Sequence, residues 1–184
     1  MFSFKRRRLD PSALLSSQLF DERAFYKAFV SDLKACQKQV VIESPYLSCR
    51  RANQLAPILK KLIRKGVKVR INTRNPNHHD QNLRIQGWKV FYQFKDLGIK
   101  VKLCDDMRHR KLAVLDECVL WEGSLNILSQ SNSREIMRRT QSPELSRQMA
   151  SFTGMNRWVW WYNEWYEWLR NYRRTNWSNV AISQ

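Results

Sequence analysis

Glycine and proline are scarce in this sequence, with five residues of each among 184. Because these residues dominate linkers, we expect no long flexible linker. No apolar run reaches the roughly 18–20 residues of a membrane-spanning helix. The start of the chain carries the basic cluster Lys5–Arg8 without a continuous apolar stretch behind it, so we expect no secretory signal peptide.

Cysteine is also infrequent, and the residues present are Cys36, Cys49, Cys104 and Cys118. No two of them form a Cys-x-x-Cys pair, and their spacings fit no zinc finger or zinc ribbon. We therefore expect reduced thiols, a cytoplasmic location and no metal site built on cysteine.

Acidic residues are few, with 16 Asp and Glu against 33 Lys and Arg, which gives a net charge of +17. This excess indicates a polyanionic partner, either nucleic acid or, less often, an anionic membrane surface. Both partners present phosphates, so charge alone does not distinguish them. Hydrophobic residues make up 43% of the chain, which excludes a wholly disordered basic tail.

Helices and strands alternate along the predicted chain. Helices are predicted at 21–36, 53–65 and 80–94, and strands at 39–43, 67–73, 99–103, 109–116, 118–121 and 133–140. Gly66 is predicted to cap a helix, 75–77 to form a turn, and Pro143 to open a helix reaching about Tyr172, with Gly154 as a candidate break. The order predicts an α/β fold. We expect a basic arm over 1–20, a globular domain over 21–142 and an aromatic-rich helical extension over 143–184.

One stretch in the second half of the chain combines residue types that act on phosphate. His109 and Lys111 are two residues apart, so on a strand they face the same side. At fixed spacings behind them follow Asp116, Gly123, Ser124 and Asn126. A neutral imidazole can attack phosphorus, and a lysine, a hydroxyl and an amide can bind the phosphate oxygens. Each residue alone is more often an ordinary surface or turn residue, but together they indicate an active site.

This His-x-Lys-x4-Asp pattern with a downstream Gly-Ser-x-Asn resembles the phospholipase D-like superfamily. The stretch 121–139 is similar to modules of that type attached to bacterial helicases and nucleases, and the resemblance covers 33–139. It implies a mixed central β-sheet flanked by helices on both faces. It also implies that His109 is the nucleophile of a phosphohistidine intermediate, with Lys111, Ser124 and Asn126 as phosphate contacts. Glu135 is then the acidic partner of the histidine, and Asp116 and Gly123 are structural.

Members of this family use no metal or other cofactor, and they take a second histidine from a second motif copy. This sequence holds one copy, because His78-His79-Asp80 lacks the lysine spacing; a polar loop and helix cap is favoured there over a metal site. We therefore expect a homodimer, or a partner such as a helicase with its own motif. An endonuclease hydrolysing DNA or RNA is favoured. The alternatives are a binding module with an idle site and a phospholipase acting on anionic lipids, although a membrane partner is not expected.

Further arginines and aromatic residues indicate how a long polyanion could be held. Contacts to nucleic acid are predicted for Arg50, Arg51, Arg74, Arg138 and Arg139, whereas Arg108 and Arg110 should point away from His109. In the tail, one helical stripe is formed by Trp158, Trp161, Trp165, Trp168 and Tyr172. It suits packing on the domain or a second subunit, or base stacking on single strands.

Overall fold

Residues 16–154 are described by the computed structural model of this chain and form a seven-stranded sheet covered by helices. The tryptophan stripe at 158–172 lies outside the described residues. The chain divides into two compact units, Met1–Ala150 and Ser151–Gln184. The predicted division into an arm, a domain and an extension is not the same as this one, and the boundary near 142 stays a prediction.

The sheet has a parallel half and an antiparallel half, in the order β1-β7-β6-β5-β2-β3-β4. The parallel strands are β2 (Gln39–Glu43), β3 (Lys68–Arg74) and β4 (Lys100–Cys104), joined by α3 (Cys49–Arg64) and by the turn η1 (Pro76–His78) with α4 (Gln81–Asp96). The antiparallel strands are β5 (Leu112–Leu115), β6 (Val119–Gly123), β7 (Ile136–Gln141) and β1 (Ser17–Asp21).

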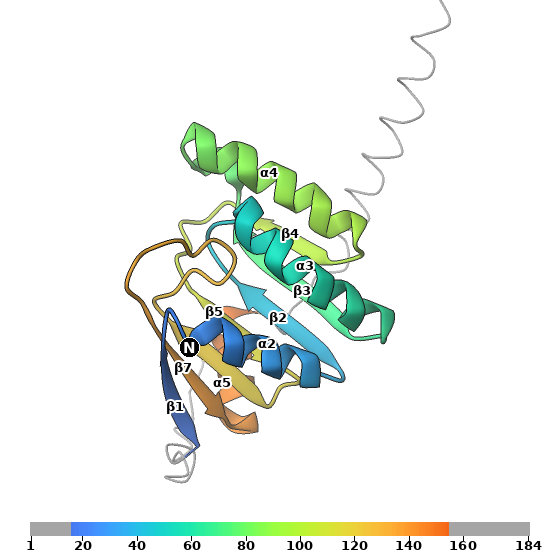
Figure 1. Cartoon of the computed structure of the whole chain (residues 1–184), viewed down its shortest axis with the longest axis vertical. Helices are drawn as coiled ribbons and strands as arrows, with labels where there is room; N and C mark the ends of the chain where they lie inside the picture. The colour runs from blue at the N-terminus through green and yellow to red at the C-terminus, as the bar shows by residue number, and fades with distance from the viewer. Residues whose placement is uncertain (1–15, 155–184) are drawn as a thin grey trace, which may run out of the picture. The chain divides into compact units, whose positions relative to one another are not determined.

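Helices cover both faces of the sheet, as predicted. Figure 1 shows α2 (Phe25–Ala35), α3 and α4 in front of the strands and α5 (Pro143–Thr153) behind them. The front layer contains the fully buried Phe25 and Phe29 of α2, which pack edge-on against the fully buried ring of Trp121. In α3, Leu55, Leu59 and Leu62 recur at helical spacing and are likewise buried.

Most predicted elements exist, and the differences lie at their ends. Strand β2 has the predicted bounds, and Gly66 adopts a φ of +84° directly behind α3, as a capping glycine does. Helix α3 begins four residues early because the Ser48 hydroxyl accepts a hydrogen bond from the N–H of Arg51. Strand β5 begins only at Leu112, so His109 and Lys111 precede the strand rather than lie on it. Helix α5 ends at Thr153, and Gly154 follows with a φ of +66°.

One strand was missed by the sequence reasoning. Residues 17–20 were assigned to a basic arm, but they belong to β1, which pairs with β7 along its whole length. The partner strand lies more than a hundred residues further along the chain, and three of the five residues of β1 are exposed, so the local pattern is weak.

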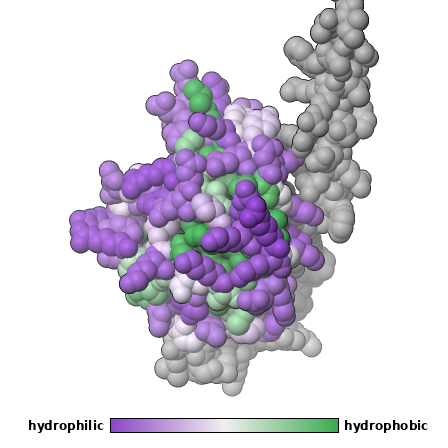
Figure 2. Space-filling model, turned by 45° about the vertical axis from the view of Figure 1, so that its right-hand side comes forward, coloured by the Kyte–Doolittle hydropathy of each residue, from purple (hydrophilic) through white to green (hydrophobic). Residues whose placement is uncertain are grey.

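Figure 2 shows one face of the molecule, which is mostly hydrophilic, with hydrophobic residues gathered near its centre. The large hydrophobic side chains with the highest exposure include Leu19 at 68% and Ile136 at 60%. Within residues 16–154, no helix is both long and apolar enough to cross a membrane.

Candidate active site

The predicted site residues meet at one edge of the sheet, because neighbouring strands end or begin there. Strands β2 and β3 finish at this edge, β5 and β7 start at it, and β6 returns to it. The N–H of Gly123 donates to the carbonyl of Lys111 at 3.2 Å, and the N–H of Ser124 donates to the carbonyl of Ile136 at 3.0 Å. The His-x-Lys and Gly-Ser-x-Asn segments are therefore held side by side by backbone hydrogen bonds.

His109 and Lys111 form a direct side-chain pair on the exposed rim. The Nζ atom of Lys111 lies 2.7 Å from Nδ1 of His109 and 2.9 Å from the carbonyl oxygen of the same residue. A charged lysine can only donate, so Nδ1 accepts and the imidazole is neutral in this arrangement. Both groups thus face the same side, as predicted, although the segment is not a strand.

The electrostatic surroundings favour the neutral form of the imidazole. Burial, the charge of Lys111 and the charge of Arg74 all lower the pKa of His109 from its ordinary value. Burial also lowers the pKa of Lys111, and the carboxylate of Glu135 acts in the opposite direction. A neutral imidazole retains a nitrogen lone pair, which is what a nucleophile requires.

The close approach of β6 to β7 explains why residue 123 is a glycine, and it brings Ser124 into contact with Ile136. A Cβ atom on Gly123 would overlap the carbonyl oxygen of Ile136 and lie 2.8 Å from the sulfur of Met137. Only glycine fits here without a shift of the neighbouring strand. The hydroxyl oxygen of Ser124 accepts the N–H of Ile136 at 3.2 Å, which leaves its proton available to a ligand.

Asn126 opens a loop that is tied to the end of β2. The backbone carbonyl oxygen of Asn126 accepts the N–H groups of Ser129 and Gln130. The N–H of Leu128 donates to the buried hydroxyl of Ser44. The Oδ1 atom of Asn126 is buried and has no hydrogen-bond partner among the described residues. A half-turn of the terminal amide would present N–H donors at that point instead.

Glu135 lies beside the site, next to Lys111. The described residues include no hydrogen bond from its carboxylate to the imidazole of His109, and its backbone N–H donates to Glu22 at 3.2 Å. The role of Glu135 as acidic partner of the histidine stays a prediction.

Asp116 sits at the far end of β5, away from the site edge. Its carboxylate accepts three backbone N–H groups at 2.8 Å, from Gln37, Lys38 and Gln39, and lies 3.1 Å from the sulfur of Cys36. Burial acts to raise the pKa of Asp116, but these hydrogen bonds outweigh it and lower the pKa. The contacts make this motif residue a tie between the β5–β6 turn and the start of β2.

Sequence reasoning missed the ring of Tyr46 beside His109 and the contact between Tyr46 and His79. The ring of Tyr46 lies 6.1 Å from the His109 ring and 4.8 Å from that of His79. Burial and the charge of Arg74 lower the pKa of His79, and a hydrogen bond with the backbone of Pro45 only partly offsets this shift. The available signal was topological: β2 and β3 are parallel neighbours, so Tyr46 behind β2 and His79 behind β3 arrive at the same edge.

Two of the predicted nucleic-acid contacts, Arg51 and Arg139, have side chains bound within the fold, and their contact with nucleic acid stays a prediction. Arg51 is 8% exposed, stacks on Tyr26 at 3.9 Å and donates to the carbonyl of Gln130 at 2.7 Å. Arg139 forms a two-pronged ion pair with Asp32 of α2, at 2.7 and 3.1 Å. Both guanidinium groups thus already have partners within the fold.

The other predicted cations remain accessible. Arg50 is exposed on the first turn of α3, and Arg74 is half-buried beside both His79 and His109. Arg138 is exposed and lines an open groove of about 560 Å³ that also includes Lys111 and Ser124. The rest of this groove is lined chiefly by Arg110, Leu19, Ile136 and Met149. Within residues 16–154, no three His, Cys, Asp or Glu side chains converge to hold a metal ion.

Comparisons with known proteins agree with the fold. Residues 29–155 match the family described as cardiolipin synthase, PLD-like domain. Among solved structures, NucT from Helicobacter pylori is 21% identical with a TM-score of 0.60, and the match covers 74% of this chain and 91% of that one. Nuc from Salmonella typhimurium, described as a phospholipase D family member, is 14% identical with a TM-score of 0.63, covering 74% and 90%.

A third similar structure has a different described activity. Phosphatidylserine synthase from Haemophilus influenzae is 15% identical with a TM-score of 0.55, and the match covers 76% of this chain and 38% of that one. At these identities the structural matches show a shared fold. A comparison with curated proteins finds no match.

Proposed function

Because this chain belongs to the cardiolipin synthase, PLD-like domain family, we propose that it is a phosphodiesterase that hydrolyses DNA or RNA through a phosphohistidine on His109. The observation that carries the proposal is the exposed His109–Lys111 pair, 2.7 Å apart, with a neutral imidazole beside the hydroxyl of Ser124. These groups match the needs of a reaction in which a nucleophile attacks a phosphate whose charge must be neutralised.

The reaction runs in two steps. A ring nitrogen of His109 uses its lone pair to attack phosphorus, the bond to one ester oxygen breaks, and that oxygen leaves with a proton from a general acid. Water then attacks the phosphohistidine, gives its proton to a base and restores the free imidazole. Lys111, Ser124 and Asn126 hold the non-bridging oxygens in both steps. Protein groups alone supply this chemistry, so the proposed mechanism needs no metal or other cofactor.

The general acid and base come from a second subunit in this proposal. The sequence has one His-x-Lys pair, and a two-fold axis beside it would bring the His109 of each subunit to the two sides of one phosphate. A hetero-partner with its own motif, such as a helicase-type protein, is the alternative arrangement.

Nucleic acid is the proposed substrate because the groove beside the site is cationic. Arg138 and Lys111 line it, Arg50 and Arg74 lie near the same edge, and the chain carries a net charge of +17. None of these groups is arranged to read base edges, so little sequence preference is expected. The four free cysteines suit the predicted cytoplasmic location, which stays a prediction.

An anionic phospholipid is the second candidate substrate. The groove also contains the exposed aliphatic side chains of Leu19 and Ile136, which could contact an acyl chain, and the family is described by a lipid enzyme. The same phosphodiester chemistry would apply.

A panel of substrates tests the proposal directly. Single- and double-stranded DNA, RNA and anionic lipid vesicles are incubated with the protein in EDTA. We expect cleavage of nucleic acid that survives chelation and disappears in His109→Ala. His78→Ala is the matched control, because His78 is also an exposed histidine but is turned toward Asp105. Binding without cleavage would establish the idle-site module instead, and vesicle hydrolysis alone would establish the phospholipase.

Subunit mixing tests the shared site. If each catalytic centre needs the His109 of both subunits, re-equilibrated equal amounts of wild type and His109→Ala should retain about a quarter of the wild-type activity, from the unmixed dimers. Retention of about half, or a monomer by light scattering, would contradict the two-subunit site.

A further inference from the structure

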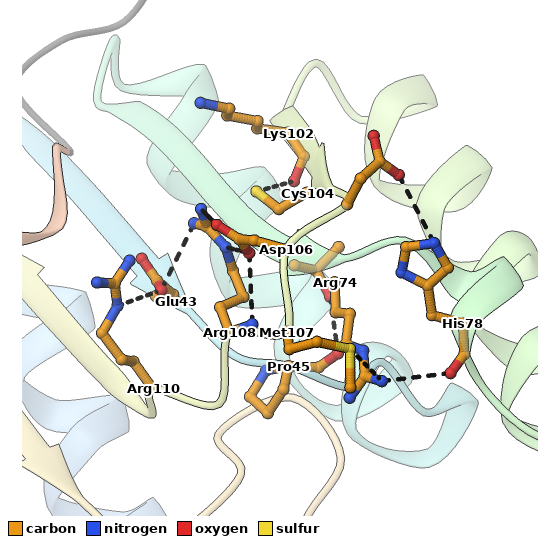
Figure 3. A network of polar contacts seen from close by, with 12 residues as sticks. Glu43, Pro45, Arg74, His78, Lys102, Cys104, Asp106, Met107, Arg108 and Arg110 are labelled. Atoms are coloured by element: carbon orange, nitrogen blue, oxygen red, sulfur yellow. Dashed lines mark hydrogen bonds and ion pairs between the residues drawn. The ribbon is translucent and has the colours of Figure 1, made fainter.

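The carboxylate of Glu43 contacts the two arginines that flank His109, a role that the sequence analysis did not assign to it. Glu43 is the last residue of β2 and is 0% exposed. Its Oε1 atom accepts from Nε of Arg110 at 2.7 Å and lies 3.5 Å from Nη1 of Arg108 (Figure 3). The two residues that flank His109 are therefore both attached to one buried carboxylate.

A second carboxylate fixes one of these arginines from the other side. Asp106 accepts from Nε and Nη2 of Arg108, each at 2.6 Å, in a two-pronged pair. The hydrogen bond between them lowers the pKa of Asp106 and raises that of Arg108, so both stay charged. The Oε2 atom of Glu43 is buried without a hydrogen-bond partner among the described residues, so the attachment depends on Oε1.

The backbone at this point lies outside regular secondary structure, although the carbonyl of Lys111 accepts from the N–H of Gly123. Strand β4 ends at Cys104 and β5 begins at Leu112, and the residues between them form neither helix nor strand. Along an extended segment, side chains alternate between two sides. The guanidinium groups of Arg108 and Arg110 contact Glu43, whereas the side chains of His109 and Lys111 contact each other.

We propose that Glu43 is a positioning residue, which holds His109 and Lys111 in the geometry of attack by anchoring the arginines that flank the histidine. The proposal rests on the proposed function. Because Glu43 is fully buried, it does not touch the substrate and acts only through Arg108 and Arg110. A displacement of about 1 Å at a reacting group can cost roughly a hundredfold in rate, so a loosened anchor should appear mainly in kcat.

The kinetic test compares two isosteric variants that each remove one arginine-bound carboxylate. Glu43→Gln removes the charge that binds Arg108 and Arg110. Asp32→Asn removes the charge that binds Arg139, at a carboxylate of α2 that also accepts the indole N–H of Trp121. On DNA, Glu43→Gln should lower kcat about 10- to 100-fold with KM within about threefold of wild type. Asp32→Asn should keep kcat per folded molecule. Equal kcat in the two variants, once corrected for the folded fraction, would overturn the proposal.

A conservative variant guards against a misfolded protein. Glu43→Asp keeps the charge and shortens the side chain by one methylene, so its kcat should lie between those of wild type and Glu43→Gln. If Glu43→Gln does not fold, the test rests on Glu43→Asp. A folded Glu43→Asp protein with wild-type kcat would then contradict the positioning role of Glu43.

A readout without turnover separates this inference from the proposed function. The ring resonances of His109 are followed by NMR as a function of pH. The groups around the ring are Lys111, Arg74 and Tyr46, and His79 contacts Tyr46. Without the Glu43 charge, Arg108 and Arg110 are no longer balanced, so the pKa of His109 should fall further in Glu43→Gln and stay unchanged in Asp32→Asn. A wild-type protein without phosphodiesterase activity would refute the proposed function. A His109 pKa that is the same in Glu43→Gln as in wild type would refute the positioning role of Glu43.

Discussion

Replacing Asp116 separates the structural part of the motif from the catalytic part. Asp116 accepts three backbone N–H groups at 2.8 Å, and it adopts a φ of +50° in the β5–β6 turn. Each hydrogen bond contributes about 1 kcal/mol net, and alanine adds roughly 1 kcal/mol of cost in the left-handed region. Asp116→Ala should therefore lose about 3–4 kcal/mol of unfolding free energy. Asp116→Asn, which keeps one oxygen and tolerates this conformation, should lose about 1–2 kcal/mol.

Urea denaturation followed by circular dichroism measures both losses, and Glu117→Ala is the matched control. Glu117 shares the left-handed conformation, with a φ of +57°, but its carboxylate accepts from the Gln39 side chain instead of the backbone. The contribution of Asp116 should be complete above the ordinary carboxyl pKa of about 4 and should shrink as the pH falls through its lowered pKa. Turnover per folded molecule should stay at the wild-type level.

Two results would refute this account of Asp116. One is an Asp116→Ala protein that loses no more stability than Glu117→Ala. The other is a folded Asp116→Asn protein whose turnover is as low as that of His109→Ala, since that would place the carboxylate in the chemistry.

Three further predictions follow from the same structure. The acid limb of kcat/KM should lie below the ordinary histidine pKa of about 6.5, because the neutral form of His109 attacks and its pKa is lowered; a limb above that value would contradict the neutral nucleophile. Arg138→Ala should weaken DNA binding and reduce the slope of log K against log salt by about one, whereas Lys65→Ala, behind the far end of α3, should leave both unchanged. Arg51→Ala should lower stability by about 2–3 kcal/mol in urea, with DNA affinity of the folded protein retained, because its guanidinium is buried against Tyr26.

The candidate site residues could be proposed from the sequence because their signals are local. The His109–Lys111 pair, the spacing to Gly123 and Ser124, and the alternation of helices and strands all lie within short stretches of sequence. Helix caps such as Ser48 and Gly66 act within one turn, so the element order followed from periodicity and the resulting fold class is correct. Tyr46 and His79 were not recognised because their proximity depends on two strands being parallel neighbours.

Only the tertiary structure decides which arginine side chains are bound within the fold and which line the groove. In the sequence, nothing distinguishes Arg51, Arg138 and Arg139 as cations. In the fold, Arg51 is buried against Tyr26, and Arg139 is bound by Asp32, which lies more than a hundred residues away. Arg138, one residue earlier on the same strand, faces the opposite side and lines the groove.

The sequence by itself determined the chemistry available at this site, because the identity and spacing of His109, Lys111 and Ser124 are covalent properties of the chain. Only the tertiary structure decided which charges remain for a substrate and which hold the catalytic segment in place. The physical reason is that a buried carboxylate such as Glu43 must be compensated, and the arginines that compensate it come from wherever the folded chain places them.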